Sequence, residues 1–456
     1  MPLADNQAVS SSKSAHPGRS RREFLAATAL AAAGATVLGR SATAQSGTTR
    51  AYPLVRARRR TPLNEGETIK IGVIGVGNHQ TGCGMGLVHC LTFAGFHKAG
   101  TEKVELVAIA DVNQLFLENA KNLIEQIQTT KVDTYTDYRE LLARDDIHGV
   151  LLAVPEHWHA KMAIESIEAG KDVYLEKPMT LNLADAMALY ENTKSNPDVI
   201  VQVGTQKTRL PKYLEAQKLI RAGAIGTPTF SQTSYCRNVP SGEWHYKIDD
   251  RWQPGVNLDW DMWCGPLGSM DWDPHLYYQW RRYRKTSTGI IGDLLVHEMT
   301  PILLAVEQGW PVRVVATGAH LHDKEMENHD NVNLAIQFET GHQMFVAGST
   351  CNEQGIETLI RGHKANLFLN GRDCEIRPER PYVEEIDPDT IKCPIIENDQ
   401  DAHRLGWLES IRTRTQPQSS VELGTMVMVI VDLATRSMWE GKAFAFDPKT
   451  MAARAV

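Results

Sequence analysis

The stretch Ile69-Lys-Ile-Gly-Val-Ile-Gly-Val-Gly77 decides the fold, because an apolar strand here runs directly into a glycine-rich turn. A helical stretch follows to about Lys98, and a second apolar strand, Val104-Glu-Leu-Val-Ala-Ile-Ala-Asp111, ends in a carboxylate. Dinucleotide-binding units have this order of elements: a strand, a glycine turn, a helix, a second strand and an acidic residue. The sequence therefore predicts a nucleotide-binding domain that begins near Thr68.

The glycine turn carries the residues that should hold the phosphates of the nucleotide. Gly75 permits the tight turn, and Gly77 lets the backbone approach a pyrophosphate at the N-terminus of the helix. Asn78 and His79 continue the turn and are predicted to contact the cofactor as well. Because Gln80 stands where the third glycine of the fingerprint is expected, we expect a longer turn than usual. Further glycines follow at Gly82, Gly84 and Gly86.

Asp111 stands where a partner for a ribose 2′-hydroxyl belongs. Its carboxylate would repel a 2′-phosphate. The sequence therefore favours NAD over NADP as the cofactor.

Strands continue to alternate with helices as far as Thr205. Apolar strands are expected at residues 149–155, 171–175 and 199–204, with helices between them. This alternation predicts an α/β fold with a Rossmann-like, doubly wound parallel sheet, whose ligands lie beyond the carboxyl ends of the strands. Three further predicted cofactor contacts follow such ends: Pro155, His159 and Gln206.

The stretch Asp172-Val-Tyr-Leu-Glu-Lys-Pro178 is typical of a buried strand that ends in an ionisable pair and a proline. Such a strand points Lys177 into the crevice where a ligand binds, with Glu176 beside it as a further cofactor contact. The alternative is that Lys177 forms only a structural ion pair with Glu176.

Six of the ten tryptophans lie in residues 244–280, here called the tryptophan segment, which shows little periodicity. A segment this polar is not expected to bury six tryptophans, so we expect a stacking wall for a ring-shaped polar ligand, with core packing as the alternative. The predicted substrate contacts are Tyr235, Trp260, Trp263, Trp280 and Arg281.

Polar and apolar residues alternate beyond the tryptophan segment. The alternating stretches are residues 312–319, 330–339, 343–349, 358–362 and 365–369. They predict an open, mostly antiparallel sheet with one face free for a partner. Helices near residues 402–413 and 422–439 should close the chain.

Asp293 and His297 lie between the tryptophan segment and this sheet. Residues four apart share one face of a helix. A surface hydrogen bond is the plain alternative for such a pair, but the preceding glycines and the surrounding apolar residues favour a functional role. Histidine suits a base that removes a hydroxyl proton while hydride leaves the carbon, because its pKa lies near neutral pH.

The N-terminus carries an export signature. Ser20-Arg-Arg-Glu-Phe-Leu25 precedes an alanine-rich apolar run, and Ala42-Thr-Ala44 provides a small-residue cleavage site. Residues 1–44 are therefore predicted to be a twin-arginine signal peptide, which places the mature protein in the periplasm without stable membrane insertion. A short membrane helix is the alternative. Residues 45–67 are predicted to be a flexible linker or an extended arm that wraps a neighbouring subunit.

The composition indicates the class of protein and argues against some kinds of ligand. A chain of 456 residues with 42% hydrophobic and 23% charged residues is typical of a globular protein of two domains. The net charge of −7 and the lack of a basic patch argue against nucleic-acid binding. Seven cysteines without C-x-x-C spacing indicate neither a disulfide framework nor a zinc site, so no metal is expected.

In order and spacing, the glycine turn, Asp111, Glu176-Lys-Pro178 and the Asp293-x-x-x-His297 pair together resemble the Gfo/Idh/MocA oxidoreductases. The resemblance covers the chain from the first strand to the C-terminus. It implies an NAD-binding Rossmann domain, residues 68–205, and an α/β domain, residues 206–456, which binds substrate and forms homo-oligomers through its open sheet. It also implies oxidation of a hydroxyl on a sugar or cyclitol.

The same resemblance implies Lys177 and His297 as the catalytic pair, with Asp293 assisting. Two departures from the family pattern stand out. The glycine turn is expanded, which bears on phosphate geometry, and Leu295 stands where many relatives have glycine, which bears on the shape of the substrate pocket.

Two enzymatic functions are consistent with these residues. The first is an oxidoreductase that acts on a sugar, glycoside or cyclitol with tightly held NAD. The second is a redox-neutral glycosidase, as in some exported relatives, which oxidises a ring hydroxyl, eliminates the aglycone, adds water and returns the hydride. A sugar-binding protein without catalysis is disfavoured, because Lys177, Asp293 and His297 are all present.

Overall fold

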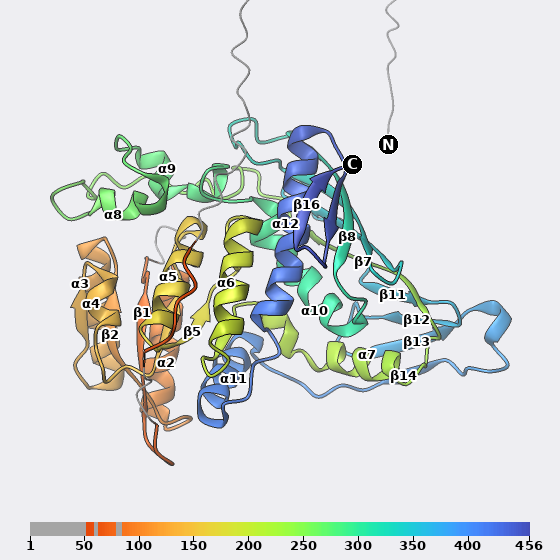
Figure 1. Cartoon of the computed structure of the whole chain (residues 1–456), viewed down its shortest axis with the longest axis horizontal. Coiled ribbons are helices and arrows are strands. Elements are labelled where there is room, and N and C mark those ends of the chain that lie inside the picture. Colours follow the sequence, from red (N-terminus) through yellow and green to blue (C-terminus); the bar gives the residue numbers. More distant parts are fainter. Residues whose placement is uncertain (1–51, 59–62, 79–83) are drawn as a thin grey trace, which may run out of the picture. The chain divides into compact units, whose positions relative to one another are not determined.

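The computed structural model describes residues 52–58, 63–78 and 84–456 (Figure 1). The predicted signal peptide with its cleavage site, and the turn residues His79 and Gln80, lie outside these residues. Among the helices of the described chain, none combines the length and the apolar character needed to cross a bilayer.

The first half of the described chain forms a six-stranded sheet in the order β3-β2-β1-β4-β5-β6, in which all neighbouring strands are parallel. This is the strand order of a doubly wound dinucleotide-binding sheet, so the predicted fold class is confirmed. The strands are β1 (Ile69–Ile74), β2 (Val104–Ala110), β3 (Asp133–Tyr135), β4 (Gly149–Leu152), β5 (Asp172–Leu175) and β6 (Val201–Val203). The helices are α2 (Met85–Ala99), α3 (Gln114–Gln128), α4 (Tyr138–Leu142), α5 (Glu156–Glu168) and α6 (Leu183–Ser195).

Local sequence explains where these elements begin and why they are buried. Every residue of β4 and β5 is buried, as expected for central strands with helices on both faces. The side chain of Asn113 accepts hydrogen bonds from the backbone N–H groups of Leu115 and Phe116 and so caps α3. Asp137 caps α4 in the same way, because its side chain accepts a hydrogen bond from the backbone N–H of Arg139.

The second half forms a ten-stranded sheet in the order β14-β13-β12-β11-β7-β10-β9-β8-β15-β16. Strands β7 and β10 are parallel and the other neighbours are antiparallel, so the predicted open, mostly antiparallel sheet is confirmed. The strands are β7 (Pro228–Cys236), β8 (Pro311–Ala319), β9 (Asn331–Phe338), β10 (Gln343–Ser349), β11 (Leu359–Gly362), β12 (Ala365–Phe368), β13 (Cys374–Pro378), β14 (Asp389–Ile391), β15 (Phe444–Asp447) and β16 (Ala452–Ala455). The helices are α7 (Pro211–Arg221), α8 (Trp260–Cys264), α9 (Pro274–Tyr278), α10 (Val296–Val306), α11 (Asp399–Thr413) and α12 (Val421–Glu440).

Helix α12 connects the sheets (Figure 1). Helix α12 packs against β8 and α6, while α10 packs against α7 and β7. One continuous apolar core contains side chains from both sheets, among them Leu175 of β5 and Val346 of β10. The carboxyl end of β5 is thereby held against the helices of the second sheet.

The tryptophan segment differs from its prediction. Trp244, Trp252, Trp260, Trp263 and Trp280 are buried and Trp272 is partly buried, so core packing, the alternative, accounts for five of the six rings. The reason is that the segment folds onto the first sheet, through α8, α9 and backbone hydrogen bonds to residues near the start of α3. Those contacts join parts of the chain far apart in sequence and leave no local pattern.

Residues 52–58, from the predicted linker or arm, lie along helix α6 of the same chain. The backbone N–H of Val55 donates to the side chain of Asn192 at 2.8 Å, and that of Ala57 donates to Asn196, also at 2.8 Å. This short piece is therefore attached to its own subunit.

A buried ion pair anchors the start of β5. Arg414, which follows α11, donates from its two terminal nitrogens to the two carboxylate oxygens of Asp172, at 2.7 and 2.8 Å. Asp172 is completely buried. Arg414 therefore compensates its charge, and the backbone N–H of Ile200 also donates to the carboxylate.

Replacing Arg414 with alanine should lower the free energy of unfolding by about 3 kcal/mol, because a buried carboxylate loses its counter-charge. Arg139→Ala is the matched control, since the pair of Arg139 with Asp137 is exposed and such a pair contributes less than about 1 kcal/mol. Urea denaturation of the wild type and both variants measures the two losses. Equal losses would contradict this role of Arg414.

Candidate active site

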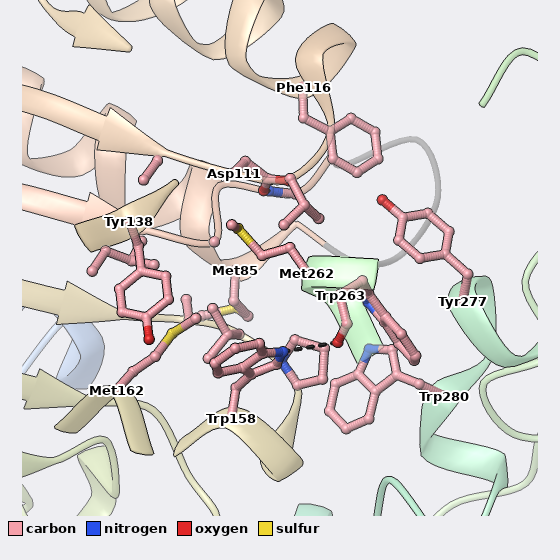
Figure 2. A pocket seen from close by; sticks show the side chains of 18 of the residues that line it. Met85, Asp111, Phe116, Tyr138, Trp158, Met162, Met262, Trp263, Tyr277 and Trp280 are labelled. Atoms are coloured by element: carbon pink, nitrogen blue, oxygen red, sulfur yellow. Dashed lines mark hydrogen bonds between the residues drawn. The ribbon is translucent and has the colours of Figure 1, made fainter. Parts of the chain in front are cut away.

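A cavity of about 1090 Å³, which includes open solvent at its mouth, lies at the carboxyl ends of β1, β2, β4 and β5. Its lining joins the glycine turn to the tryptophan segment, and side chains from both halves face it in Figure 2. The first half contributes Gly75, Gly77, Asp111, Phe116, Pro155, Trp158, Glu176 and Lys177, among others. The second half contributes Trp252, Met262, Trp263, Tyr277, Tyr278, Trp280 and Arg281. A large, mainly apolar cleft with a few convergent polar groups is typical of a cofactor and substrate site.

The glycine turn has the geometry that a dinucleotide needs. Gly75 has a φ of +84°, and a Cβ atom there would lie 2.7 Å from the carbonyl oxygen of Ala153. Helix α2 begins at Met85, and a Cβ atom on Gly86 would lie 1.8 Å from the carbonyl oxygen of Gly75. Gly86 thus provides the close helix–strand packing of the third fingerprint glycine. The late start of α2 agrees with a longer turn.

Asp111 closes this turn. Its Oδ2 accepts hydrogen bonds from the backbone N–H groups of Val76 at 2.8 Å and Gly77 at 3.1 Å. Burial raises the pKa of Asp111 to about 6, although these bonds favour the carboxylate. At neutral pH the carboxylate is ionised and lies at the cavity, where it can accept hydrogen bonds from ribose hydroxyls. The turn and Asp111 therefore fit a dinucleotide.

Lys177 meets Asp293 at the other end of the cavity. The ammonium of Lys177 donates to Asp293 Oδ1 at 2.8 Å and to the Asp293 carbonyl at 3.0 Å. Arg281, whose guanidinium lies 4.2 Å from the centre of the Trp280 ring, donates to the same Oδ1 at 3.0 Å. Burial would raise the pKa of Asp293, but the two cations outweigh it and hold the pKa well below its usual range. The structure thus brings together Lys177, Asp293 and Arg281, which the sequence predicts in different roles.

His297 completes this cluster. Asp293 lies in a π-helical turn (Ile291–Leu295), and His297 lies in the first turn of α10 directly after it. Single π-helical turns occur frequently at functional sites. Burial, and then the positive charge of Lys177, lower the pKa of His297 to about 3. The imidazole is therefore neutral at neutral pH, and its pKa lies well below the near-neutral value that favoured histidine as the base in the sequence.

Glu176 has a different partner from the one considered in the sequence. Its Oε1 accepts a hydrogen bond from His89 Nε2 at 2.9 Å, and His89 Nδ1 accepts one from Arg404 Nε at 2.8 Å. These side chains are buried, and burial lowers the pKa of His89, so the imidazole is neutral. Because Lys177 pairs with Asp293, the alternative of a Lys177–Glu176 ion pair is wrong. The sequence does not indicate His89 or Arg404 as partners of Glu176, since α2 and α11 are far apart in the chain.

Two of the predicted substrate contacts, Trp260 and Tyr235, do not line the described cavity. Trp260 stacks behind Trp263, with ring centroids 4.8 Å apart, and supports it from outside the described cavity lining. Tyr235 lies beside Lys207 and Arg237, whose charged groups are 6.0 and 5.7 Å from the centre of its ring. Of the five predicted residues, Trp263, Trp280 and Arg281 line the cavity.

Three of the predicted cofactor contacts are likewise outside the described lining. His159 is buried, with its ring nitrogens 2.6 Å from the carbonyl oxygen of Pro178 and 2.8 Å from that of Val154. It therefore joins the ends of β4 and β5. Gln206 Nε2 lies 3.4 Å from a Glu176 oxygen, and Asn78 follows the glycine turn without lining the described cavity.

The described residues were also compared with the side-chain groups that hold metal ions. Within the parts of the chain that the structure describes, no three histidine, cysteine, aspartate or glutamate side chains gather in a group that could hold a metal ion.

Two family models match this chain. The model of an oxidoreductase family with an NAD-binding Rossmann fold matches residues 69–205. The model of the C-terminal alpha/beta domain of that oxidoreductase family matches residues 217–446. Together they cover most of the chain.

Similar proteins of known name include glycoside hydrolases. A "Glycosyl hydrolase family 109 protein" of Shewanella baltica is 31% identical over 191 residues, which are 40% of this chain and 38% of that protein. An "Alpha-N-acetylgalactosaminidase" of Shewanella oneidensis is 31% identical over 180 residues, which are 38% of this chain and 36% of that protein. The chain thus covers less than half the length of these curated relatives.

Similar solved structures include sugar oxidoreductases. Levoglucosan dehydrogenase in complex with NADH has a TM-score of 0.62 at 19% identity, over 83% of this chain and 98% of that chain. Aldose-aldose oxidoreductase from Caulobacter crescentus, complexed with glycerol, has a TM-score of 0.62 at 17% identity, over 83% of this chain and 99% of that chain. At these identities the likeness shows the fold.

Lys177→Met should raise the pKa of His297 above about 3, because it removes the positive charge that disfavours the imidazolium. Asp293→Asn should shift the pKa of His297 in the opposite direction, since the Asp293 carboxylate favours the imidazolium. Proton NMR titration of His297 in both variants measures the shifts. Shifts in the same direction would contradict the assigned charges.

Proposed function

This chain belongs to the Gfo/Idh/MocA family of oxidoreductases, and on that premise we propose that it transfers a hydride between a carbinol carbon of a sugar, glycoside or cyclitol and NAD. One observation carries the proposal. Lys177, which pairs with Asp293, lines the same cavity as Asp111 and the glycine turn, so a hydroxyl bound beside Lys177 would share this cavity with a nucleotide held at the turn. NAD is favoured over NADP, because Asp111 would repel a 2′-phosphate.

The side chains supply what hydride transfer from an alcohol requires. When bound, the nicotinamide provides the hydride acceptor. A hydroxyl can lose hydride from its carbon only if its proton leaves as well, and neutral His297 can accept that proton. Lys177 would donate a hydrogen bond to the same oxygen and stabilise its developing negative charge. Asp293 accepts a hydrogen bond from the ammonium of Lys177 and so orients it, and Arg281 donates to the same carboxylate oxygen.

A redox-neutral glycosidase is the second candidate. It is favoured by the relatives named as a family 109 glycosyl hydrolase and as an alpha-N-acetylgalactosaminidase. Oxidation of a ring hydroxyl makes the hydrogen on the adjacent carbon acidic, so a base can remove it and the aglycone can leave. Addition of water and reduction then complete a hydrolysis. The same Lys177 and His297 would serve the first and last steps of this sequence.

Product analysis tests the proposal and separates the two candidates. The purified protein is denatured to assay retained nicotinamide nucleotide, and the intact protein is incubated with nitrophenyl glycosides and with free sugars. Net oxidised sugar supports the oxidoreductase, whereas nitrophenol released without net reduction of the nucleotide supports the glycosidase. Lys177→Met should lower either activity by about 10²–10⁴-fold.

Lys194→Met is the matched control, because Lys194 is an exposed lysine on α6 and its loss should leave activity unchanged. Full activity in Lys177→Met would refute the assigned role of Lys177. Absence of both products and of bound nucleotide would refute the proposed function as a whole.

We further propose that a second copy of the chain covers the open face of the ten-stranded sheet. Strands β8, β9 and β10 alternate buried and exposed residues, and their outward side includes the exposed apolar residues Val315 and Phe345. Phe345 contacts Phe230 of β7 edge to face, so the apolar surface extends across the sheet. Contiguous exposed apolar surface is typical of protein interfaces.

Phe345→Glu should convert the oligomer into monomers, because it places a charge at the centre of this face. Val383→Glu is the control, since Val383 is an exposed apolar residue that lies outside these strands. Light scattering after size-exclusion chromatography measures the mass of each protein. A monomeric wild type, or a Phe345→Glu variant of unchanged mass, would refute the proposed interface.

A further inference from the structure

Glu176 lines the cavity beside Lys177, directly after β5. Its side chain is almost fully buried, and a Cβ atom on Gly204 would lie 3.0 Å from its carboxyl carbon, so the packing around it leaves little room for movement. Its Oε2 accepts a hydrogen bond from the backbone N–H of Lys177 at 3.1 Å. The carboxylate is therefore fixed at the end of the cavity where the alcohol is proposed to bind.

Two buried side chains from helices α2 and α11 continue from Glu176 into the protein. Arg404 can only donate hydrogen bonds, so its Nε–H, 2.8 Å from His89 Nδ1, makes that nitrogen an acceptor. The neutral imidazole therefore carries its proton on Nε2, which donates to Glu176 Oε1 at 2.9 Å. Asp401 accepts from Arg404 Nη1 at 2.7 Å and balances the charge of the guanidinium. Arg404 thus selects the tautomer of His89 that donates to Glu176.

This arrangement keeps Glu176 ionised. Burial would raise its pKa, but the hydrogen bond from His89 and the positive charge of Lys177 outweigh burial and lower the pKa to about 2. Lys177 nevertheless makes its ion pair with Asp293. Among the described residues, the side chain that pairs with the Glu176 carboxylate is the neutral His89. A negative charge without an adjacent cation therefore remains on the wall of the cavity.

A charge at this place acts differently on the two oxidation states of a nicotinamide. The oxidised ring is positively charged, whereas the reduced ring is neutral. Hydride transfer requires the ring to lie next to the carbinol carbon, and the proposed function binds the hydroxyl of that carbon beside Lys177. Charges interact more strongly in a buried site than in water. The Glu176 carboxylate would therefore stabilise the oxidised ring relative to the reduced one.

We propose that the hydrogen-bonded chain from Arg404 through His89 holds Glu176 as a negative charge in the cavity, and that this charge favours binding of the oxidised nucleotide over the reduced one. The inference rests on the proposed function, since it takes the ligand of the cavity to be a nicotinamide dinucleotide. His89 and Arg404 are positioning residues, because they act through Glu176. Their effect makes the bound reduced nucleotide a stronger hydride donor, which favours return of the hydride to an oxidised substrate.

Two dissociation constants for each variant test the inference without any assay of activity. The full chain is freed of copurified nucleotide, and calorimetry at neutral pH measures the Kd of NAD and the Kd of NADH. Glu176→Gln keeps the shape of the side chain and removes its charge. It should shift the ratio of the two constants about tenfold towards NADH, which equals a rise of about 30 mV in the potential of the bound nucleotide.

Asp111→Asn is the matched control, because Asp111 is a second buried carboxylate of the same cavity that lies at the glycine turn. Its predicted contact is a ribose, whose charge does not change with the oxidation state of the nicotinamide. The variant should weaken the binding of NAD and NADH by similar factors and leave their ratio unchanged. An unchanged ratio in Glu176→Gln, or an equal shift in Asp111→Asn, would overturn the inference.

Two variants of His89 test the hydrogen-bonded chain itself. The amide of His89→Gln can accept from Arg404 and donate to Glu176, so its ratio should stay close to that of the wild type. His89→Met cannot donate, so the buried carboxylate of Glu176 should take up a proton and the ratio should shift towards that of Glu176→Gln. A folded His89→Met variant with the wild-type ratio would overturn the role of His89. A wild type that binds neither nucleotide would refute the proposed function instead.

Discussion

The contact between Lys177 and Asp293 is the interaction on which the site depends. It joins the end of β5 to the π-helical turn before α10, over 116 positions of sequence. Both side chains are almost fully buried, so either charge alone would be costly. The apolar core shared by the two sheets brings the groups to 2.8 Å, and Arg281 adds a second positive charge on the same carboxylate oxygen. The apolar packing between the two sheets and the attraction between these charges therefore both hold the end of β5 against the π-helical turn.

The cavity divides into two chemically different ends. Asp111 and the glycine turn provide a backbone geometry and a carboxylate that suit a nucleotide, whereas Lys177 provides a cation that suits an alcohol oxygen. His297 follows Asp293 in the chain and lies outside the described lining. Aromatic rings of the tryptophan segment lie along the cavity between these ends. The distinction between an oxidoreductase and a redox-neutral glycosidase therefore depends on what happens to the oxidised substrate, because the first hydride transfer is the same.

The sequence predicts the features that arise from local patterns. The glycine turn, Asp111 and Lys177 are each set by a short strand and its end, so they could be located without the structure. The Glu176–His89–Arg404 chain could not, because His89 and Arg404 lie 315 positions apart and their helices carry no signal of their contact. The burial of the tryptophans could not be predicted for a similar reason, since it depends on contacts with the β2–α3 connection, which is distant in the sequence. Trp260 and Trp263 are alike in sequence, and only the stack shows which of them faces the cavity.

A single-turnover experiment tests the central claim most directly. The protein loaded with NAD is mixed rapidly with a sugar or glycoside that it converts, and the near-ultraviolet absorbance of reduced nicotinamide is followed. The account predicts that this absorbance rises, that the rise slows when the carbinol carbon bears deuterium, and that Lys177→Met nearly abolishes it. Substrate conversion without any rise in absorbance, in a protein shown to contain NAD, and with no effect of deuterium, would contradict the account.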